Sequence, residues 1–334
     1  RFAAAGRPAV GTLNTADWHY AMIRGDDFYR HMRNELAARP EVTWIKAVVK
    51  RIEDGADAAT VWLDVDGAGN APWQPHHGTW VFDSLFNIHK FEPDPARYRY
   101  LKQCFKGWFI ETPEDAFDAS QATIFDFRTP QAGEMRFFYV LPTSPRVALV
   151  EYVGLSEVDY DALLDDYVRG VLGIHEYSII SDETGTTPLT DYPFPRRTGR
   201  HIITTGIQGG LVKPTSGYAY TRILDDSAAI VRSLLAHGHP FDVPATKPLY
   251  RWLDSVMLEV MRAEPERLAD AFTAMFARNP APRIFRFLDE RASLADIVGL
   301  VLTLPKLPFL RGAGRLVTNT LMPQRTQRPQ RLFE

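Results

Sequence analysis

One carboxylate in this sequence lies where a charge is costly. Glu151 interrupts the apolar segment Val147-Ala148-Leu149-Val150-Glu151-Tyr152-Val153. A buried carboxylate without a partner avoids the cost of its charge by taking up a proton. A neutral carboxylic acid in an apolar cavity is a suitable proton donor to an alkene. The alternative is that Glu151 faces solvent on the polar side of an alternating strand.

A second acidic residue, Glu183, lies in the segment Asp182-Glu183-Thr184-Gly185-Thr186-Thr187-Pro188-Leu189. The glycine and proline that follow are typical of a turn, so one interpretation is a solvated acidic turn residue. The other interpretation is a carboxylate that faces an active site. The sequence leaves both open.

A glycine-rich turn separates a β-rich segment from a predicted helix. Its candidate ligand-binding residues are Gly206, Gly209, Gly210, Lys213, Pro214, Thr215, Ser216 and Gly217. Glycines permit positive φ and close approach of a ligand, and the first turn of a helix favours an anion. Lys213 would add a full positive charge. Such a place suits the negatively charged edge of an isoalloxazine ring, and a tight turn without a ligand is the alternative that the spacing leaves equally open.

The remaining composition excludes several classes of protein. The nine histidines show no metal-binding spacing, so no metal site is predicted, and no Gly-x-Ser-x-Gly elbow or Walker loop is present. The formal net charge of −3 gives no basis for nucleic-acid binding. The single cysteine, Cys104, excludes an intrachain disulfide, fits a reducing compartment and predicts a buried, inert thiol. No signal peptide is recognisable, and the apolar run at 297–304 is too short to span a bilayer.

The helices and strands that must position these residues follow one another along the chain in an order that indicates an α+β fold. A helix is predicted from Asp26 or Asp27 to about 38, followed by strands at 42–52, 60–65 and 79–82, with a loop at 67–78. Four strands at 100–111, 121–128, 134–141 and 145–154 predict an antiparallel sheet. A helix at 158–172, strands at 176–180 and 201–205 and a helix from about 216 to 237 follow. From Tyr250 we expect helices broken by Pro265, Pro280, Pro282 and Pro305.

The turn is similar to the second flavin motif of aromatic-hydroxylase-type FAD proteins, but Ile207 replaces the aspartate of that motif. With this replacement the turn resembles that of lycopene β-cyclases, Gly-x-x-Gly-Gly-x-x-x-Pro-x-(Ser/Thr)-Gly-Tyr. Further blocks resemble this family in its order, at 20–31, 82–84, 105–112, 125–128, 137–142 and 148–152. Two departures stand out: Leu85 where many relatives carry arginine, and Tyr152-Val153 where relatives carry an acidic residue and threonine.

The resemblance implies a FAD-binding Rossmann-like fold of the aromatic-hydroxylase type, with an antiparallel-sheet substrate domain and C-terminal helices. We expect residues 1–99 to be the remainder of the FAD-binding domain, with its first nucleotide-binding unit absent from this chain. Residues 100–182 are then the substrate domain, 183–240 a returning FAD-binding segment, 241–312 the helical region and 313–334 a basic, disordered tail. Asp126 and Arg128 are expected to form a structural ion pair.

The implied activity is that of a lycopene β-cyclase, an isomerase that closes the ends of lycopene into β-ionone rings without net redox change. In this family the residue matching Glu151 serves as the acid–base catalyst, and the residue matching Glu183 stabilises positive charge near the flavin. The implied cofactors are reduced FAD and NAD(P)H as the reductant. Because lycopene dissolves in membranes, we expect a cytoplasmic protein attached peripherally to the inner membrane, through helices at 285–310 or the arginines of the tail.

Two other functions remain open from the sequence. A flavin-dependent oxidoreductase, such as a hydroxylase or an isoprenoid reductase, would change the oxidation state of its substrate. A carotenoid- or lipid-binding protein on the same fold would hold a pigment without turnover. The ring type, the number of ends cyclised and the oligomeric state also stay open.

Overall fold

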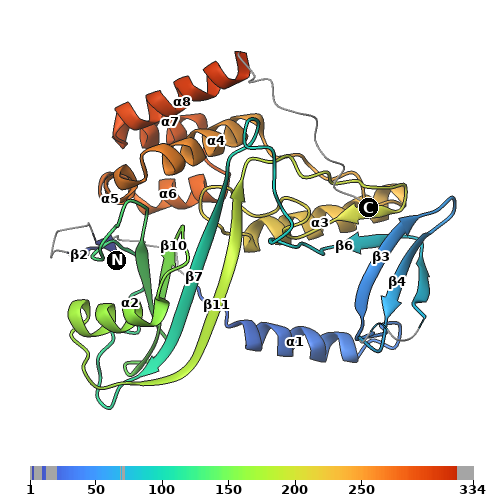
Figure 1. The fold of residues 1–334 in the computed structure, drawn as a ribbon, viewed down its shortest axis with the longest axis horizontal. Helices are drawn as coiled ribbons and strands as arrows, with labels where there is room; N and C mark the ends of the chain where they lie inside the picture. The colour runs from blue at the N-terminus through green and yellow to red at the C-terminus, as the bar shows by residue number, and fades with distance from the viewer. Residues whose placement is uncertain (1, 4–9, 13–20, 68, 70–71, 322–334) are drawn as a thin grey trace.

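A seven-stranded sheet is the largest element of the computed structural model, which describes residues 2–3, 10–12, 21–67, 69 and 72–321 (Figure 1). Its strand order is β11-β7-β10-β9-β8-β1-β2, and neighbours are antiparallel except for β1 and β8. The strands are β1 (Phe2–Ala3), β2 (Val10–Gly11), β7 (Tyr100–Glu111), β8 (Thr123–Asp126), β9 (Phe137–Pro142), β10 (Val147–Gly154) and β11 (Ser178–Thr190). The four predicted strands from 100 to 154 are therefore confirmed.

One face of this sheet packs against α2 (Tyr160–Asp166), which continues into a π-helical turn at Tyr167–Val171. The ring of Phe138 stacks on that of Tyr167, with 3.8 Å between the ring centroids. The Tyr167 hydroxyl donates to Asp126, whose carboxylate also accepts hydrogen bonds from the Arg128 guanidinium. The predicted structural ion pair between Asp126 and Arg128 is confirmed, and a tyrosine completes it. Cys104 is buried, as predicted.

The C-terminal helices cover the other side of the core and lie above the strands in Figure 1. They are α4 (Pro248–Ala263), the 3-10 turn η2 (Pro265–Arg267), α5 (Leu268–Arg278), α6 (Ala281–Leu288), α7 (Leu294–Thr303) and α8 (Lys306–Leu321). Pro282 does not break a helix, because it lies in the first turn of α6, where a missing N–H removes no intrahelical bond. The tail expected from 313 is also corrected, since α8 continues to Leu321; residues 322–334 lie outside the described residues.

The strand that leads to the glycine-rich turn belongs to a short two-stranded parallel sheet. β12 (Ile202–Thr204) pairs with β6 (Val81–Asp83), and α3 (Tyr220–His237) follows the turn. The helix therefore begins a few residues later than predicted. The amide of Thr205 donates to the carbonyl of Asp83, which fixes the start of the turn beside the end of β6.

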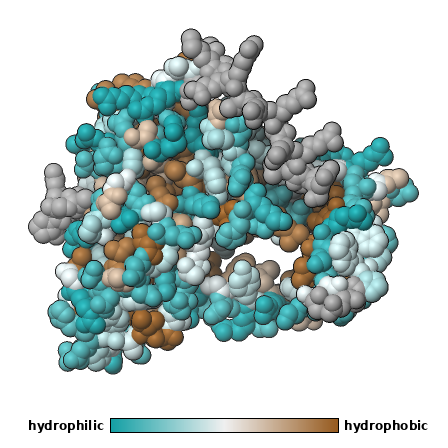
Figure 2. Space-filling view, in the orientation of Figure 1, coloured by the Kyte–Doolittle hydropathy of each residue, from teal (hydrophilic) through white to brown (hydrophobic). Residues whose placement is uncertain are grey.

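Helix α1 (Gly25–Ala37) links the main body to a separate three-stranded antiparallel sheet, β3 (Val48–Asp54), β4 (Ala59–Asp64) and β5 (Gln74–Gly78). None of the α1 side chains is buried, and the space-filling view is hollowed between α1 and the elements above it (Figure 2). The predicted loop at 67–78 is wrong in part, because β5 occupies its second half by pairing with β4. Asp26 and Asp27 lie inside the first turn of α1 and do not cap it.

Candidate active site

The two acidic residues singled out in the sequence lie in one row across three strands. Glu151 of β10 is directly opposite Gly107 of β7, and Gly107 is opposite Glu183 of β11. Tyr139 of β9 is opposite Glu151 on its other side. Neighbouring strands are about 4.8 Å apart, so the two glutamate Cα atoms are separated by roughly 10 Å. Their side chains lie on the same face of the sheet, on either side of the glycine, and line the same cavity.

The environment of Glu151 favours its neutral form. Burial first, and then the charge and side chain of Glu183, together raise the pKa of Glu151 from its ordinary value of 4.5 to about 8. Both causes disfavour a second negative charge at this place. At neutral pH the pair therefore holds a proton on Glu151 next to a second acidic group.

The two glutamates line a cavity of about 530 Å³, called here the carboxylate cavity. Phe105 and Phe109 of β7 stand on either side of Gly107 in its wall, and the guanidinium of Arg24 lies 5.2 Å from the centre of the Phe109 ring. Ser216 and Gly217 of the glycine-rich turn also line it. The structure thus brings both predicted catalytic residues together with the end of the predicted cofactor motif.

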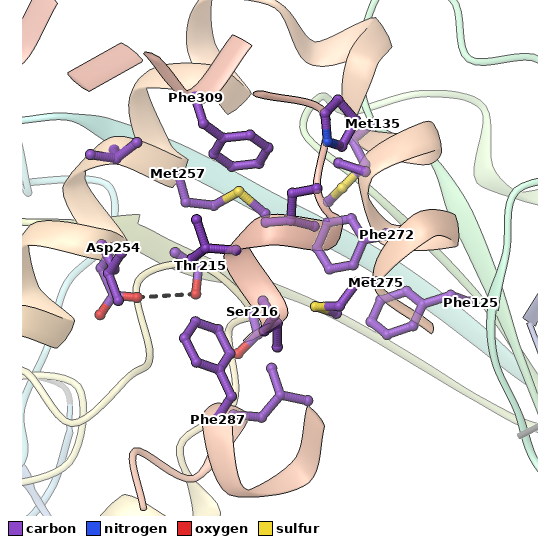
Figure 3. A pocket seen from close by; sticks show the side chains of 18 of the residues that line it. Phe125, Met135, Thr215, Ser216, Asp254, Met257, Phe272, Met275, Phe287 and Phe309 are labelled. Carbon is purple, nitrogen blue, oxygen red and sulfur yellow. Dashed lines mark hydrogen bonds between the residues drawn. The ribbon is translucent and has the colours of Figure 1, made fainter. Parts of the chain in front are cut away.

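A second cavity of about 340 Å³, called here the apolar cavity, lies between the sheet and the C-terminal helices. Figure 3 shows aromatic and methionine side chains around it, among them Phe272, Met275 and Phe309. The two cavities adjoin, because four residues line both of them: Gln103, Tyr139, Ser216 and Tyr218. At this boundary the hydroxyl oxygens of Tyr139 and Tyr218 are 2.8 Å apart. An elongated apolar molecule in the second cavity would therefore point one end toward the glutamates.

The glycine-rich turn needs glycine at three of its positions. Gly206, Gly210 and Gly217 have φ values of +57°, +71° and +74°, which side chains other than glycine adopt rarely. A Cβ on Gly217 would also lie 2.1 Å from the Oε1 atom of Gln103. These values give the physical reason for the sequence pattern at the boundary of the two cavities.

The residues of the turn are not all directed to one cavity. Thr215 lines the apolar cavity and donates a hydrogen bond to Asp254 (Figure 3). Gly209, Gly210 and Pro214 instead line a third cavity of about 590 Å³. Of the predicted cofactor-binding residues, Ser216 and Gly217 are thus the two that line the carboxylate cavity.

Lys213 is placed differently from the expectation. Its side chain is buried, and its ammonium group lies 2.7 Å from Asp254 and 3.0 Å from Glu290. Burial raises the pKa of Asp254, and the nearby Lys213 charge opposes that effect. The positive charge expected to face a ligand is therefore balanced by two carboxylates inside the protein.

The site also settles the interpretation of Glu183 and adds residues that the sequence did not single out. Glu183 lies in the middle of β11, so it is not a turn residue, although its side chain is exposed to solvent. Gly107, Tyr139 and Gln103 were not predicted as site residues. A glycine inside an otherwise bulky strand was the available signal for Gly107, since such a glycine marks a close approach. The other two become recognisable once the strands are in register.

A flavin ring needs polar partners at this place, and the structure offers some. The hydroxyl oxygen of Ser216 is buried without a hydrogen-bond partner among the described residues. Such an orphaned group at a cavity wall fits a polar edge of a ligand. The adjoining Gly217 carries no side chain, and the Gln103 carboxamide, which also lines both cavities, packs against it. The residues at the junction of the cavities therefore fit the polar edge of a flavin.

A family model described as lycopene cyclase protein matches residues 7–313. The chain belongs to the lycopene cyclase family. No curated protein sequence matches this family member at a significant level. Within the described residues, no helix has the length and apolar character needed to cross a membrane, and no three His, Cys, Asp or Glu side chains are placed to bind a metal ion.

Solved structures are similar to this lycopene cyclase family member, and the first of the two described here shows its fold. A geranylgeranyl bacteriochlorophyll reductase-like protein from Thermoplasma acidophilum has 11% identity and a TM-score of 0.51, over 88% of this chain and 74% of that protein. A flavin-dependent brominase has 12% identity and a TM-score of 0.49, over 82% of this chain and 73% of the brominase. The predicted α+β, Rossmann-like fold with an antiparallel sheet is confirmed.

Proposed function

We propose that this chain is a lycopene β-cyclase, which closes the ends of a linear polyene into rings without net redox change. The observation that supports this most is the Glu151–Glu183 pair, which favours a protonated Glu151 in a cavity that adjoins an apolar one. A neutral acid is needed to protonate an alkene, and an apolar cavity is needed to hold the substrate. Family membership supports the same reaction class.

The proposed reaction begins with the proton on Glu151. Glu151 donates it to the terminal double bond of the polyene, and a tertiary carbocation forms. The neighbouring alkene attacks this cation and closes the ring. A carboxylate, either the ionised Glu151 or Glu183, then removes a proton to leave the ring alkene. One proton enters and one leaves, so the mass and the oxidation state of the substrate are unchanged.

The ionised pair also stabilises the cation. Once Glu151 has given up its proton, two carboxylates face the positive charge from the wall of the carboxylate cavity. Charge stabilisation of this kind is stronger away from bulk water. The aromatic rings near the pair, Phe105, Phe109 and Tyr139, present π faces that attract a cation as well.

The polar junction of the cavities is the proposed place of the cofactor, FAD in its reduced form with NAD(P)H as the reductant. Ser216, Gly217 and Gln103 would hold the polar edge of the ring. When bound, an electron-rich reduced flavin supplies electrostatic stabilisation of positive charge. The residues of the chain keep the roles of proton donor and proton acceptor.

We also propose that the substrate arrives from a lipid surface. The apolar cavity is lined in part by exposed residues of α7 and α8, among them Val301, Leu302 and Leu310. Further exposed apolar side chains extend this surface: Leu294, Val298 and Leu307. Of the residues predicted to touch the membrane, Ile297 and Leu300 are instead buried in the core. A lipid-facing surface at the cavity would let a polyene enter without crossing water.

This attachment can be measured with vesicles that contain anionic lipid. Wild-type protein should co-sediment with them, and the double change Leu302→Glu and Leu310→Glu should release it. Leu235→Glu on α3 is the matched control, because Leu235 is 83% exposed but lies away from the cavity. Equal release by the control and the double change would count against this surface.

The cyclase proposal is tested by expressing the full-length gene in a lycopene-accumulating host and analysing the pigments. Wild type should yield cyclic carotenoids of the same mass as lycopene, and Glu151→Gln should leave lycopene unchanged. Glu111→Gln, an exposed glutamate at the end of β7, should behave as wild type. A product of altered mass would favour the oxidoreductase alternative. Unchanged lycopene with the wild-type gene would defeat the cyclase proposal.

A further inference from the structure

Gly107 lies between the two glutamates and carries no side chain. We infer that this glycine is a positioning residue of the acid: the gap above it is what lets the carboxyl groups of Glu151 and Glu183 meet. The inference rests on the proposed function for its catalytic meaning, but the meeting of the two carboxyl groups can be measured without any substrate.

The backbone of Gly107 does not require glycine, because its φ is not positive. The space above it does. A Cβ at this position would lie 2.7 Å from Leu149 Cδ1, and 3.3 and 3.4 Å from the Cβ and Cγ atoms of Glu151. Real Cβ atoms almost never approach a heavy atom within 3.0 Å. Any side chain here would therefore displace Leu149 and move the stem of Glu151.

The positions two residues before and two residues after Gly107 on β7 show how a side chain is placed between β10 and β11. Two residues before Gly107, Phe105 lies against Gly185 of β11, where a Cβ would come within 2.4 Å of the ring. Two residues after it, Phe109 is opposite Leu149 on one side and Ser181 on the other. In both rows β7 carries a phenyl side chain between its neighbours on β10 and β11, whereas at Gly107 it carries none. Gly107 is the gap between these two rings, and the carboxyl groups use it.

A glycine in a strand interior is less stable than alanine, because it loses more conformational freedom on folding and has no side chain to pack. A chain that keeps glycine here without a backbone requirement gains something else from it. The gain proposed is the shared proton: across roughly 10 Å of sheet, two glutamates reach each other only if the position between them is empty.

Other ionisable groups face the pair, and none of them replaces Gly107. They come from the start of α1, from β9, from β11 and from the turn before α3: Arg24, Asp26, Tyr29, Tyr139, Asp182 and Tyr218. Arg24 is the cation among the described residues that line this cavity, and it lies against Phe109. A change at position 107 leaves all of these groups in place, so it isolates the contact between the two carboxyl groups.

The test is a titration of the Glu151 carboxyl group by infrared spectroscopy, with its band assigned by its loss in Glu151→Gln. The test variant is Gly107→Ala with Leu149→Val, because valine removes the Cδ1 atom that the new methyl would strike. The single change Leu149→Val is its matched reference. Thermal unfolding checks that each variant is folded.

In the reference variant, Leu149→Val, the pH midpoint of the Glu151 titration should stay near that of wild type. In the double variant it should fall by about one pH unit, because the like charge and the hydrogen bond are lost while burial remains. Glu183→Gln removes the second carboxylate and should lower the midpoint by a similar amount. A double variant with the midpoint of Leu149→Val alone would overturn the inference.

A second variant tests the reach of the pair without adding a methyl to the sheet. Glu183→Asp shortens the exposed partner by one methylene, so the two carboxyl groups should no longer meet, and the midpoint should fall as in Glu183→Gln. An unchanged midpoint in Glu183→Asp would also overturn the inference.

Cyclisation assays then separate this inference from the proposed function. If the chain is a cyclase, the double variant should lose about five-fold in kcat at pH 8 relative to Leu149→Val, with little change in KM. Its loss should diminish at lower pH, where the acid is protonated in both variants. If wild type forms no cyclic product, the proposed function fails, yet the titration still decides whether Gly107 brings the carboxyl groups together.

Discussion

Replacement of Glu151 by glutamine should make the stability of this protein less sensitive to pH. An acid whose pKa is raised in the folded state binds more protons folded than unfolded, between the two pKa values. Stability is therefore lost as pH rises from the unfolded pKa toward the folded one. For Glu151 these values are 4.5 and about 8. Wild type should lose stability from this residue across that range and lose little more above it.

The magnitude follows from the two pKa values. At 1.36 kcal/mol per pH unit, the full contribution has an upper limit of about 5 kcal/mol. Between pH 6 and pH 9 the same relation gives a loss of about 3 kcal/mol, which solvent in the cavity reduces to about 2 kcal/mol. The glutamine variant keeps a neutral side chain that can still donate to Glu183, so it should lose this much less over the same interval.

The assay is urea unfolding at pH 6 and pH 9 for wild type, Glu151→Gln and Glu111→Gln. Glu111 is exposed on β7, so its variant should follow wild type and corrects for all other titrating groups. The quantity compared is the change in unfolding free energy between the two pH values. If this change in wild type and in Glu151→Gln agrees within about 0.5 kcal/mol, the interpretation of Glu151 as a buried residue that holds a proton is refuted.

Three further predictions concern the rate and the buried charges. The rate of cyclisation should fall as pH rises through about 8, because the donor loses its proton; a pH–rate profile measures this, and a rate that keeps rising would contradict it. Lys213→Met should destabilise the fold by about 3 to 5 kcal/mol, because the carboxylate of Asp254 is left buried without its cation. Denaturant unfolding measures this loss, and the double variant Lys213→Met with Asp254→Asn should recover part of it. Tyr167→Phe should cost about 1.5 to 3 kcal/mol, because a 2.6 Å hydrogen bond to the buried, charged Asp126 is lost; a thermal midpoint equal to that of wild type would contradict the buried network.

The central strands could be predicted from the sequence because their local patterns are strong. The strand at 100–111 was placed with the bounds that β7 has in the structure, since bulky and β-branched residues alternate there. Glu151 was found because a charge in an apolar strand conflicts with its neighbours. Both signals lie within a short window of residues, so neither needs knowledge of the partner strand.

The pairings between distant residues could not be predicted in the same way. That Glu151 and Glu183 share a row with Gly107 follows from the register of three strands, which local patterns do not specify here. Lys213 was expected to serve a ligand, because its carboxylate partners lie 41 and 77 residues further along the chain. The strand predicted at 176–180 misses the C-terminal part of β11 for a related reason. The residues of that part resemble a turn, and only pairing with β7 makes them a strand.

The contact between the hydroxyl groups of Tyr139 and Tyr218 has a consequence for a symmetrical substrate. A rod-shaped molecule lying in the apolar cavity would present one end to the boundary at these two hydroxyl groups, with the other end among the C-terminal helices. Only the end beyond the two phenols can meet the acid. A molecule with rings at both ends must therefore have been released, reversed and admitted a second time, and a one-ringed compound should accumulate on the way.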